Sequence, residues 1–126
     1  MWVDALIRRA QVGGAYACVV MRGDRDAGSV LVTVRAGDGL CLYTPERDMQ
    51  GDRVWREDRL DEADLYARIA SRRDFDPDLI VVEIEDRDGR HFIEETVVRA
   101  EQGPGSEAQA DAAEHVAAAQ ALFRGR

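Results

Sequence analysis

The stretch from Phe75 to Phe92, FDPDLIVVEIEDRDGRHF, decides the fold. It opens with a proline turn, continues into a run rich in β-branched residues, and reaches the turn dipeptide Asp88-Gly89. An Asp-Gly pair favours a type I′ turn, because both central positions of that turn need a positive φ. The sequence therefore predicts a β-hairpin in which strands 79–85 and 90–98 pair across this turn.

The two-residue loop would set the register of the hairpin, and side chains would alternate between the two faces of the sheet. One face would be mainly apolar, with a charged pair close to the turn. The other face would gather three carboxylates, which repel one another unless something compensates them. The pairs are Asp86 with His91 on the first face, and Glu83 with Glu94, next to Glu85, on the second.

Solvent, arginines from elsewhere in the chain, or a divalent cation could compensate these glutamates. Mg²⁺ and Mn²⁺ take carboxylate oxygens, so Glu83, Glu85 and Glu94 are the candidate metal ligands. A solvated or arginine-paired acidic face is the more ordinary interpretation, since surface charge mostly does no more than this. We expect no cofactor, with a Mg²⁺ or Mn²⁺ site as the alternative.

The composition is that of one soluble domain. The chain has 126 residues, 45% of them hydrophobic, and a formal charge of −8. No run is long enough to cross a membrane, and the acidic charge argues against general binding to nucleic acid. All 17 basic residues are arginines, which excludes a catalytic lysine. We expect a cytoplasmic protein that binds neither nucleic acid nor membranes.

Three other residues are candidates for an interaction surface. Trp55 lies in RVWREDR at 53–59, whose charged residues suit an exposed edge strand. Asp86 and His91 would form a pair that could do acid–base work but more often is a structural ion pair. We assign no catalytic residue. A small ligand beside Trp55 and the loop 45–52 is a further possibility.

Elsewhere, periodicity predicts helices and strands that would pack into one α+β domain. Asp61 is typical of a helix N-cap, and the segment 60–78 is long enough for a crossover to a parallel strand. Cys18 and Cys41 match no metal spacing and are expected as free thiols. The predicted helices span 2–11 and 61–73, and the other predicted strands span 15–22, 29–35, 40–44 and 53–59, the first three as a meander.

The expected fold is therefore a mixed, mainly antiparallel sheet, made of the meander and the C-terminal hairpin, with two packed helices. This domain would span residues 1–100. The sequence EQGPG at 101–105 is typical of a linker. Residues 106–126 are rich in alanine, which favours helix but buries little, so we expect a C-terminal helix or tail there.

Several stretches together are similar to a known family. They are Trp2-Val3 with Arg8-Arg9, GDRDAG at 23–28, Leu42-Tyr43 followed by Pro45, and above all the stretch 75–92. Over about residues 1–96 the chain resembles the short alphaproteobacterial proteins catalogued as domain of unknown function 1491. The resemblance implies a small bacterial protein, and it carries over no activity, substrate or catalytic residue.

Two classes of function follow from these features. The first is a non-enzymatic protein-interaction module, whose partner is another protein or a second copy of the chain. The alternative is a metal-dependent hydrolase or nuclease that uses Glu83, Glu85 and Glu94. The lack of lysine and of a basic groove argues against the nuclease, because a phosphate backbone needs positive charge to hold it.

Overall fold

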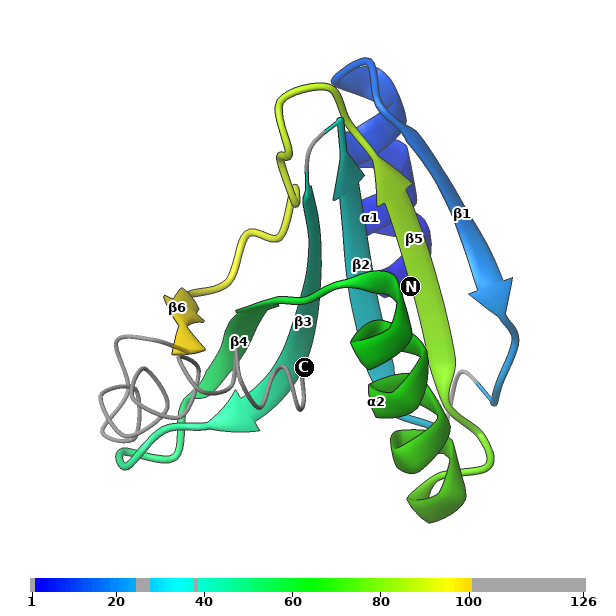
Figure 1. Ribbon diagram of the computed structural model, residues 1–126. Helices are drawn as coiled ribbons and strands as arrows, with labels where there is room; N and C mark the ends of the chain where they lie inside the picture. The colour runs from blue at the N-terminus through cyan, green and yellow to red at the C-terminus, as the bar shows by residue number, and fades with distance from the viewer. Residues whose placement is uncertain (1, 25–27, 38, 101–126) are drawn as a thin grey trace, which may run out of the picture.

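The computed structural model describes residues 2–24, 28–37 and 39–100. In these residues two helices lie against a six-stranded mixed sheet, so the predicted α+β class is confirmed (Figure 1). The predicted linker at 101–105 and alanine-rich segment at 106–126 lie outside the described residues. The elements are α1 (Trp2–Val12), β1 (Tyr16–Met21), β2 (Val30–Ala36), β3 (Gly39–Arg47), β4 (Arg53–Arg59), α2 (Glu62–Phe75), β5 (Ile80–Glu85) and β6 (Val97–Arg99).

Strand β5 lies inside the sheet, whose order is β1-β5-β2-β3-β4-β6. It is antiparallel to β1 and parallel to β2, with α2 in the connection that makes the parallel pair possible. The crossover prediction is confirmed. The predicted meander is wrong in its first strand, because β5 separates β1 from β2. A continuous apolar run is buried on both faces, which explains why β5 takes an inner position.

The turn after β5 forms, but the predicted hairpin does not. Gly89 has a φ of +73°, and its N–H donates to the carbonyl of Asp86 at 3.1 Å. Beyond the turn the chain leaves β5 and adds β6 parallel to β4 at the far edge of the sheet (Figure 1). Since β1 and β2 already occupy both sides of β5, the strand 90–98 has no place beside it. The predicted pairs across the hairpin are therefore wrong.

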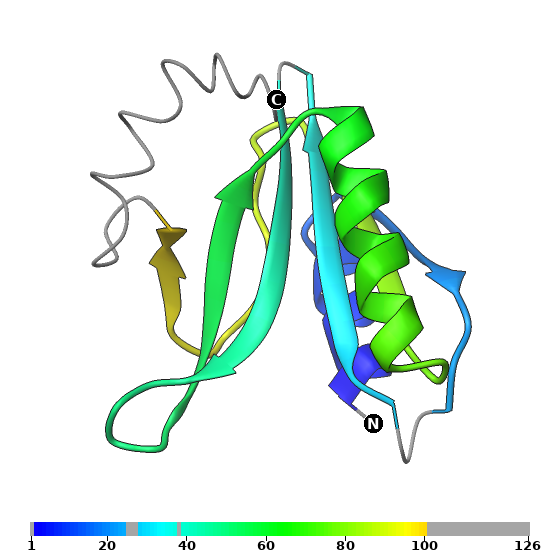
Figure 2. The same ribbon diagram turned by 60° about the horizontal axis from the view of Figure 1, so that its bottom comes forward.

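The two helices lie on opposite sides of the sheet (Figures 1 and 2), and each side has an apolar cluster. We call the two sides the α1 face and the α2 face, after the helix that covers each. The α2 face has the smaller cluster, which includes Leu31, Leu40, Leu42, Leu65, Leu79 and Val81. The α1 face has the larger one, which includes Val3, Leu6, Ala10, Val32, Tyr43, Trp55, Val82, Ile84 and Ile93.

Local chemistry explains where the elements end. The side chain of Asp61 accepts a hydrogen bond from the Asp64 N–H at 2.8 Å, which confirms the predicted N-cap of α2. Helix α1 ends at Val12, and Gly14, two residues later, has a φ of +93°, which favours glycine. The loop predicted at 45–52 is shorter than expected, because β3 continues to Arg47 and the turn spans only 48–52.

Candidate functional site

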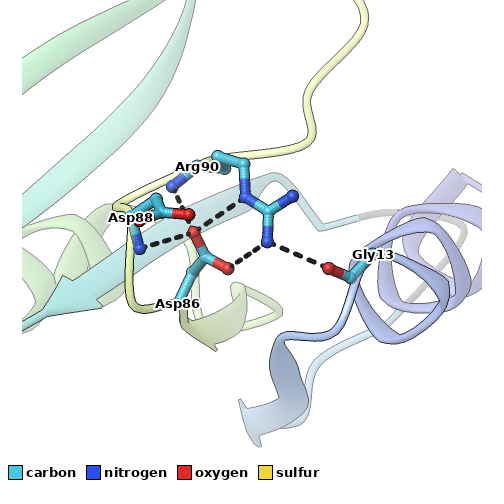
Figure 3. A network of polar contacts seen from close by, with 4 residues as sticks. All are labelled: Gly13, Asp86, Asp88 and Arg90. Atoms are coloured by element: carbon cyan, nitrogen blue, oxygen red, sulfur yellow. Dashed lines mark hydrogen bonds and ion pairs between the residues drawn. The ribbon is translucent and has the colours of Figure 1, made fainter.

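Asp86, predicted to face His91, is instead buried and paired with Arg90 (Figure 3). Its carboxylate accepts from Arg90 Nε at 3.0 Å and Nη2 at 2.8 Å, and from the N–H groups of Asp88 and Arg90 at 3.1 and 2.9 Å. The Arg90 side chain is the main cause that holds the pKa of Asp86 down to about 2. Arg90 Nη2 also donates to the Gly13 carbonyl at 2.9 Å. This group, the Asp86 clasp, ties the turn after β5 to the end of α1.

The segment after the clasp is also tied to α1. Arg9 Nε donates to the carbonyl of Phe92 at 3.0 Å and lies 3.7 Å from a carboxylate oxygen of Glu94. The Arg90 guanidinium lies 4.9 Å from the centre of the Phe92 ring. Gly13 leaves room for that ring, since a Cβ there would meet it at 2.6 Å. These contacts fix the path of the chain toward β6.

His91 lies against Tyr43, with ring centres 5.1 Å apart, rather than against Asp86. Its Nδ1 accepts from the Ile93 N–H at 2.9 Å, and burial lowers the pKa of His91. The Tyr43 hydroxyl donates to Glu57 at 2.6 Å, and burial together with this carboxylate raises the pKa of Tyr43. His91 is therefore a neutral packing group in this arrangement.

Trp55 belongs to the core. Its exposed fraction is 0%, its ring stacks on Trp2 at 5.1 Å, and its Nε1 donates to Glu95 at 2.5 Å. The strand that carries it is not an edge strand, because β6 pairs with its outer side. With Asp86 also buried, Trp55, Asp86 and His91 do not form the exposed surface that the interaction hypothesis placed there.

The three glutamates considered as metal ligands lie apart. Glu83 is 3.8 Å from Arg35, while Glu94 is beside Arg9. Glu85 is exposed at the end of β5. The hairpin register that would have joined them is wrong, and the described residues contain no group of three or more His, Cys, Asp or Glu arranged to hold a metal ion.

The acidic residues of FDPD are turn and cap groups. Asp76 accepts from the N–H and the hydroxyl of Ser29, both at 2.8 Å, and these bonds lower the pKa of Asp76. The Asp24 N–H donates to the Asp78 carbonyl at 3.1 Å. Gly23 packs so closely on that carbonyl that no Cβ would fit. Gly23 and Asp24 therefore pack against Asp78 of the FDPD stretch.

Two features of the described residues are not explained by packing, capping or ion pairing within the fold alone. The first is the outer edge of β1. Strand β1 ends the sheet on its side, and no backbone–backbone hydrogen bond from the described residues reaches its outer edge. The strand reads YACVVM and has no charged side chain, while Tyr16 is 61% and Val20 53% exposed. Natural edges are usually protected by charge, proline or a bulge. Here the one such device is an irregularity between Val19 and Met21.

The second feature is a cleft of about 270 Å³ between α2 and the meander β2–β4. It combines an apolar floor with several guanidinium and hydroxyl groups. We call it the arginine cleft. Its lining residues are Leu31, Leu42, Thr44, Arg56, Arg68, Ser71, Arg72 and Phe75.

Comparisons with known proteins identify a family and solved structures of similar fold. The family model described as protein of unknown function (DUF1491) matches residues 1–94. A crystal structure of a DUF1491 family protein from Caulobacter crescentus CB15 is 46% identical, with 77% of this chain and 94% of that chain covered and a TM-score of 0.71. The solution structure of a protein from A. tumefaciens is 31% identical, with coverages of 79% and 92% and a TM-score of 0.62. No curated protein matches the chain. Within the described residues, no helix has the length and apolar character to span a membrane.

Proposed function

The chain belongs to the DUF1491 family, and we propose that it is a small, non-enzymatic protein-interaction module that self-associates through the edge of β1. The observation that carries the proposal is the uncharged outer edge of this strand, with two exposed apolar side chains. Unpaired N–H and C=O groups along an edge are a template for another strand. Strand addition is an established mode of protein recognition, in which the main chain supplies the hydrogen bonds.

A second copy of β1 fits this edge. Two identical strands can pair antiparallel about a two-fold axis perpendicular to the sheet, which closes the assembly with one self-complementary contact. Because β1 carries no charge, no like charges would oppose each other across the pair. The two sheets would join into one, with both copies of α1 on the same side.

The symmetry also sets which residues would meet. Under such an axis one residue faces its own counterpart, and Cys18 lies near the middle of β1. Tyr16 would then oppose Val20 of the partner subunit, and the contact would remove both apolar side chains from water. Burial of apolar surface contributes about 25 cal/mol per Å². The pairing therefore uses the two side chains that the isolated chain leaves exposed.

Sedimentation analysis over a range of concentrations tests this proposal with a matched pair of variants. Val20→Lys places a charge on the β1 edge, and Val98→Lys places the same charge on β6 at the opposite edge, where Val98 is 39% exposed. We expect a concentration-dependent dimer whose Kd rises at least about tenfold, or 1.4 kcal/mol, in Val20→Lys and stays unchanged in Val98→Lys. A parent chain that stays monomeric at millimolar concentration would contradict the proposal, as would equal weakening by both variants.

Oxidative cross-linking gives a second, independent readout. The proposed register brings the two Cys18 thiols together, whereas Cys41 lies on β3, inside the sheet. Mild oxidation should give a covalent dimer with the parent and with Cys41→Ser, and no covalent dimer with Cys18→Ser. A cross-link that survives Cys18→Ser would exclude this register.

A further inference from the structure

The arginine cleft lies on the α2 face, away from the β1 edge. In Figure 2, α2 crosses in front of the sheet, and the meander β3–β4 diverges from it. The apolar floor is formed by Leu31 and Leu42, which are 1% and 2% exposed. Ser71 and Phe75 of α2 lie at its open side, and Phe75 is 86% exposed. The cleft therefore has one apolar wall and one wall that reaches solvent.

Its charges are arranged around one buried carboxylate. Asp58, which is 8% exposed, lies 3.1 Å from Arg56 Nε and 3.4 Å from Arg68 Nη1. Glu46 lies 3.0 Å from Arg56 Nη1. The two carboxylates thus compensate two guanidinium groups and also hold them in position. Paired arginines of this kind are pre-organised, so little side-chain freedom is left to lose when a ligand binds.

Arg72 supplies the remaining charge. No salt bridge within 4.0 Å is found for it among the described residues, and Asp76, on which its charge acts, is already held by Ser29 through two hydrogen bonds. Arg56 and Arg68 are compensated by Glu46 and Asp58, whereas the carboxylate near Arg72 is already bound by Ser29, so the Arg72 guanidinium has donors left for a ligand. A single guanidinium with free donors matches a monoanion better than the dianion of a phosphate ester.

We propose that the arginine cleft binds a small monocarboxylate that carries an apolar or aromatic group. The carboxylate would lie at Arg72, within reach of the Thr44 and Ser71 hydroxyls, because a planar guanidinium can bond both oxygens of a carboxylate. The apolar group would lie on Leu31 and Leu42, with Phe75 closing over it. The volume of about 270 Å³ is at the small end of ligand sites, which limits the ligand to a few carbon atoms or one ring.

Amide chemical-shift titration of the full-length chain with 3-phenylpropanoate tests the proposal. We expect saturable shifts at Thr44, Arg56, Ser71 and Arg72, which line the cleft. The neutral isostere 3-phenylpropanamide should bind at least about tenfold more weakly, since it lacks the charge. Shifts that do not saturate, or an equal response to the amide, would overturn the proposal.

Two variants on α2 separate the cleft from general charge. Arg72→Gln should weaken phenylpropanoate binding at least about tenfold, whereas Arg73→Gln should leave it unchanged, because Arg73 is exposed and does not line the cleft. Equal loss in both variants would mean that net charge alone attracts the ligand, and the site would be rejected. Melting temperatures of both variants check that the fold is intact.

Two further ligands test the charge argument and the source of the carboxylate. Phenyl phosphate should bind more weakly than phenylpropanoate to the parent and more tightly to Asp58→Asn, in which two guanidinium groups lose their shared partner. Tighter binding of phenyl phosphate to the parent would refute the monoanion assignment. A short peptide that ends in phenylalanine separates the two sources: tenfold tighter binding than phenylpropanoate would replace the small carboxylate by a chain terminus. Neither result depends on the oligomeric state.

Discussion

On the α1 face the helix buries three side chains against the sheet, whereas on the α2 face the helix buries one. Val3, Leu6 and Ala10 of α1 are at most 2% exposed, while Leu65 alone is buried in α2. The Asp86 clasp and Arg9 also tie α1 to the rest of the chain. Helix α2 is held at its two ends by the N-cap Asp61 and the C-cap Asp76, and Glu62 forms an ion pair with Arg35.

This difference in packing assigns different roles to the two faces of the sheet. A helix with few buried contacts opens locally at lower free energy than one that is packed along its length. Both the arginine cleft and the exposed ring of Phe75 lie along α2. The α1 face therefore holds the fold together, and the α2 face can adapt to a ligand at little cost to global stability.

The largest predicted effect compares one leucine from each helix. Leu6 and Leu65 are 0% and 2% exposed, so both would leave a cavity when truncated. We expect Leu6→Ala to lower the free energy of unfolding by about 4 kcal/mol and Leu65→Ala by about 2 kcal/mol, because the loosely packed site can relax. Urea denaturation measures both. Equal losses would mean that α2 is packed as firmly as α1.

Breaking the Asp86 clasp should cause the next largest loss of stability. Asp86→Ala leaves two turn N–H groups without their acceptor and removes the partner of Arg90, which at 47% side-chain exposure can still be hydrated. We expect a loss of about 2–3 kcal/mol. Asp88→Ala, an exposed acidic residue of the same turn, should change stability by less than about 0.5 kcal/mol. A loss of similar size in both variants would assign the effect to the turn rather than to the clasp.

Lowering the pH should reduce the free energy of unfolding by protonating the same carboxylate, that of Asp86. The pKa of Asp86 is lowered to about 2, against an unfolded value of about 3.9. The unfolded chain therefore binds the proton first as pH falls, so this contribution is complete above pH ~4 and is lost on approach to pH ~2. Urea midpoints between these values should fall less steeply with acid in Asp86→Asn. Parallel slopes in variant and parent would rule out Asp86 as a main source.

The smallest effect concerns a hydroxyl on the α2 face. Thr33 is 1% exposed, and its Oγ1 has no hydrogen-bond partner among the described residues. Thr33→Val keeps the shape and removes the unpaired group, so we expect a gain of about 0.5–1 kcal/mol. Thr96→Val, at an exposed position, is the control and should change little. A destabilised Thr33→Val would reveal a hydroxyl partner, such as a bound water.

Local signals in the sequence predicted the helices, strands and turns better than they predicted which strands pair with each other. Asp61, Gly89 and the helix ends act through hydrogen bonds to nearby residues, so a single sequence reports them. The hairpin prediction failed because the turn at Gly89 does not reveal that β1 and β2 both pair with β5. The signal against it was the unbroken apolar run 79–82, which is typical of a strand buried on both faces.

The candidate sites were missed for a related reason. Trp55 was assigned to a surface because β4 was expected at an edge, whereas the short strand β6 pairs with the outer side of β4 and Trp2 stacks on the Trp55 ring. Arg68 and Arg72 were not singled out as site residues, because their approach to Arg56 depends on how α2 crosses the meander. Pairing over long sequence distances, and the packing that follows from it, is what one sequence does not show.

The inner position of β5 also governs the order in which the chain can fold during synthesis. Tyr16 pairs with Glu85, so β1 must wait for its partner strand until most of the domain has been made. At about 5–20 residues per second, the wait lasts roughly 3–13 s. The meander β2–β4, in contrast, has its partners as soon as Arg59 has emerged. An uncharged strand is thus left without its partner strand for seconds during synthesis, before it becomes part of the sheet.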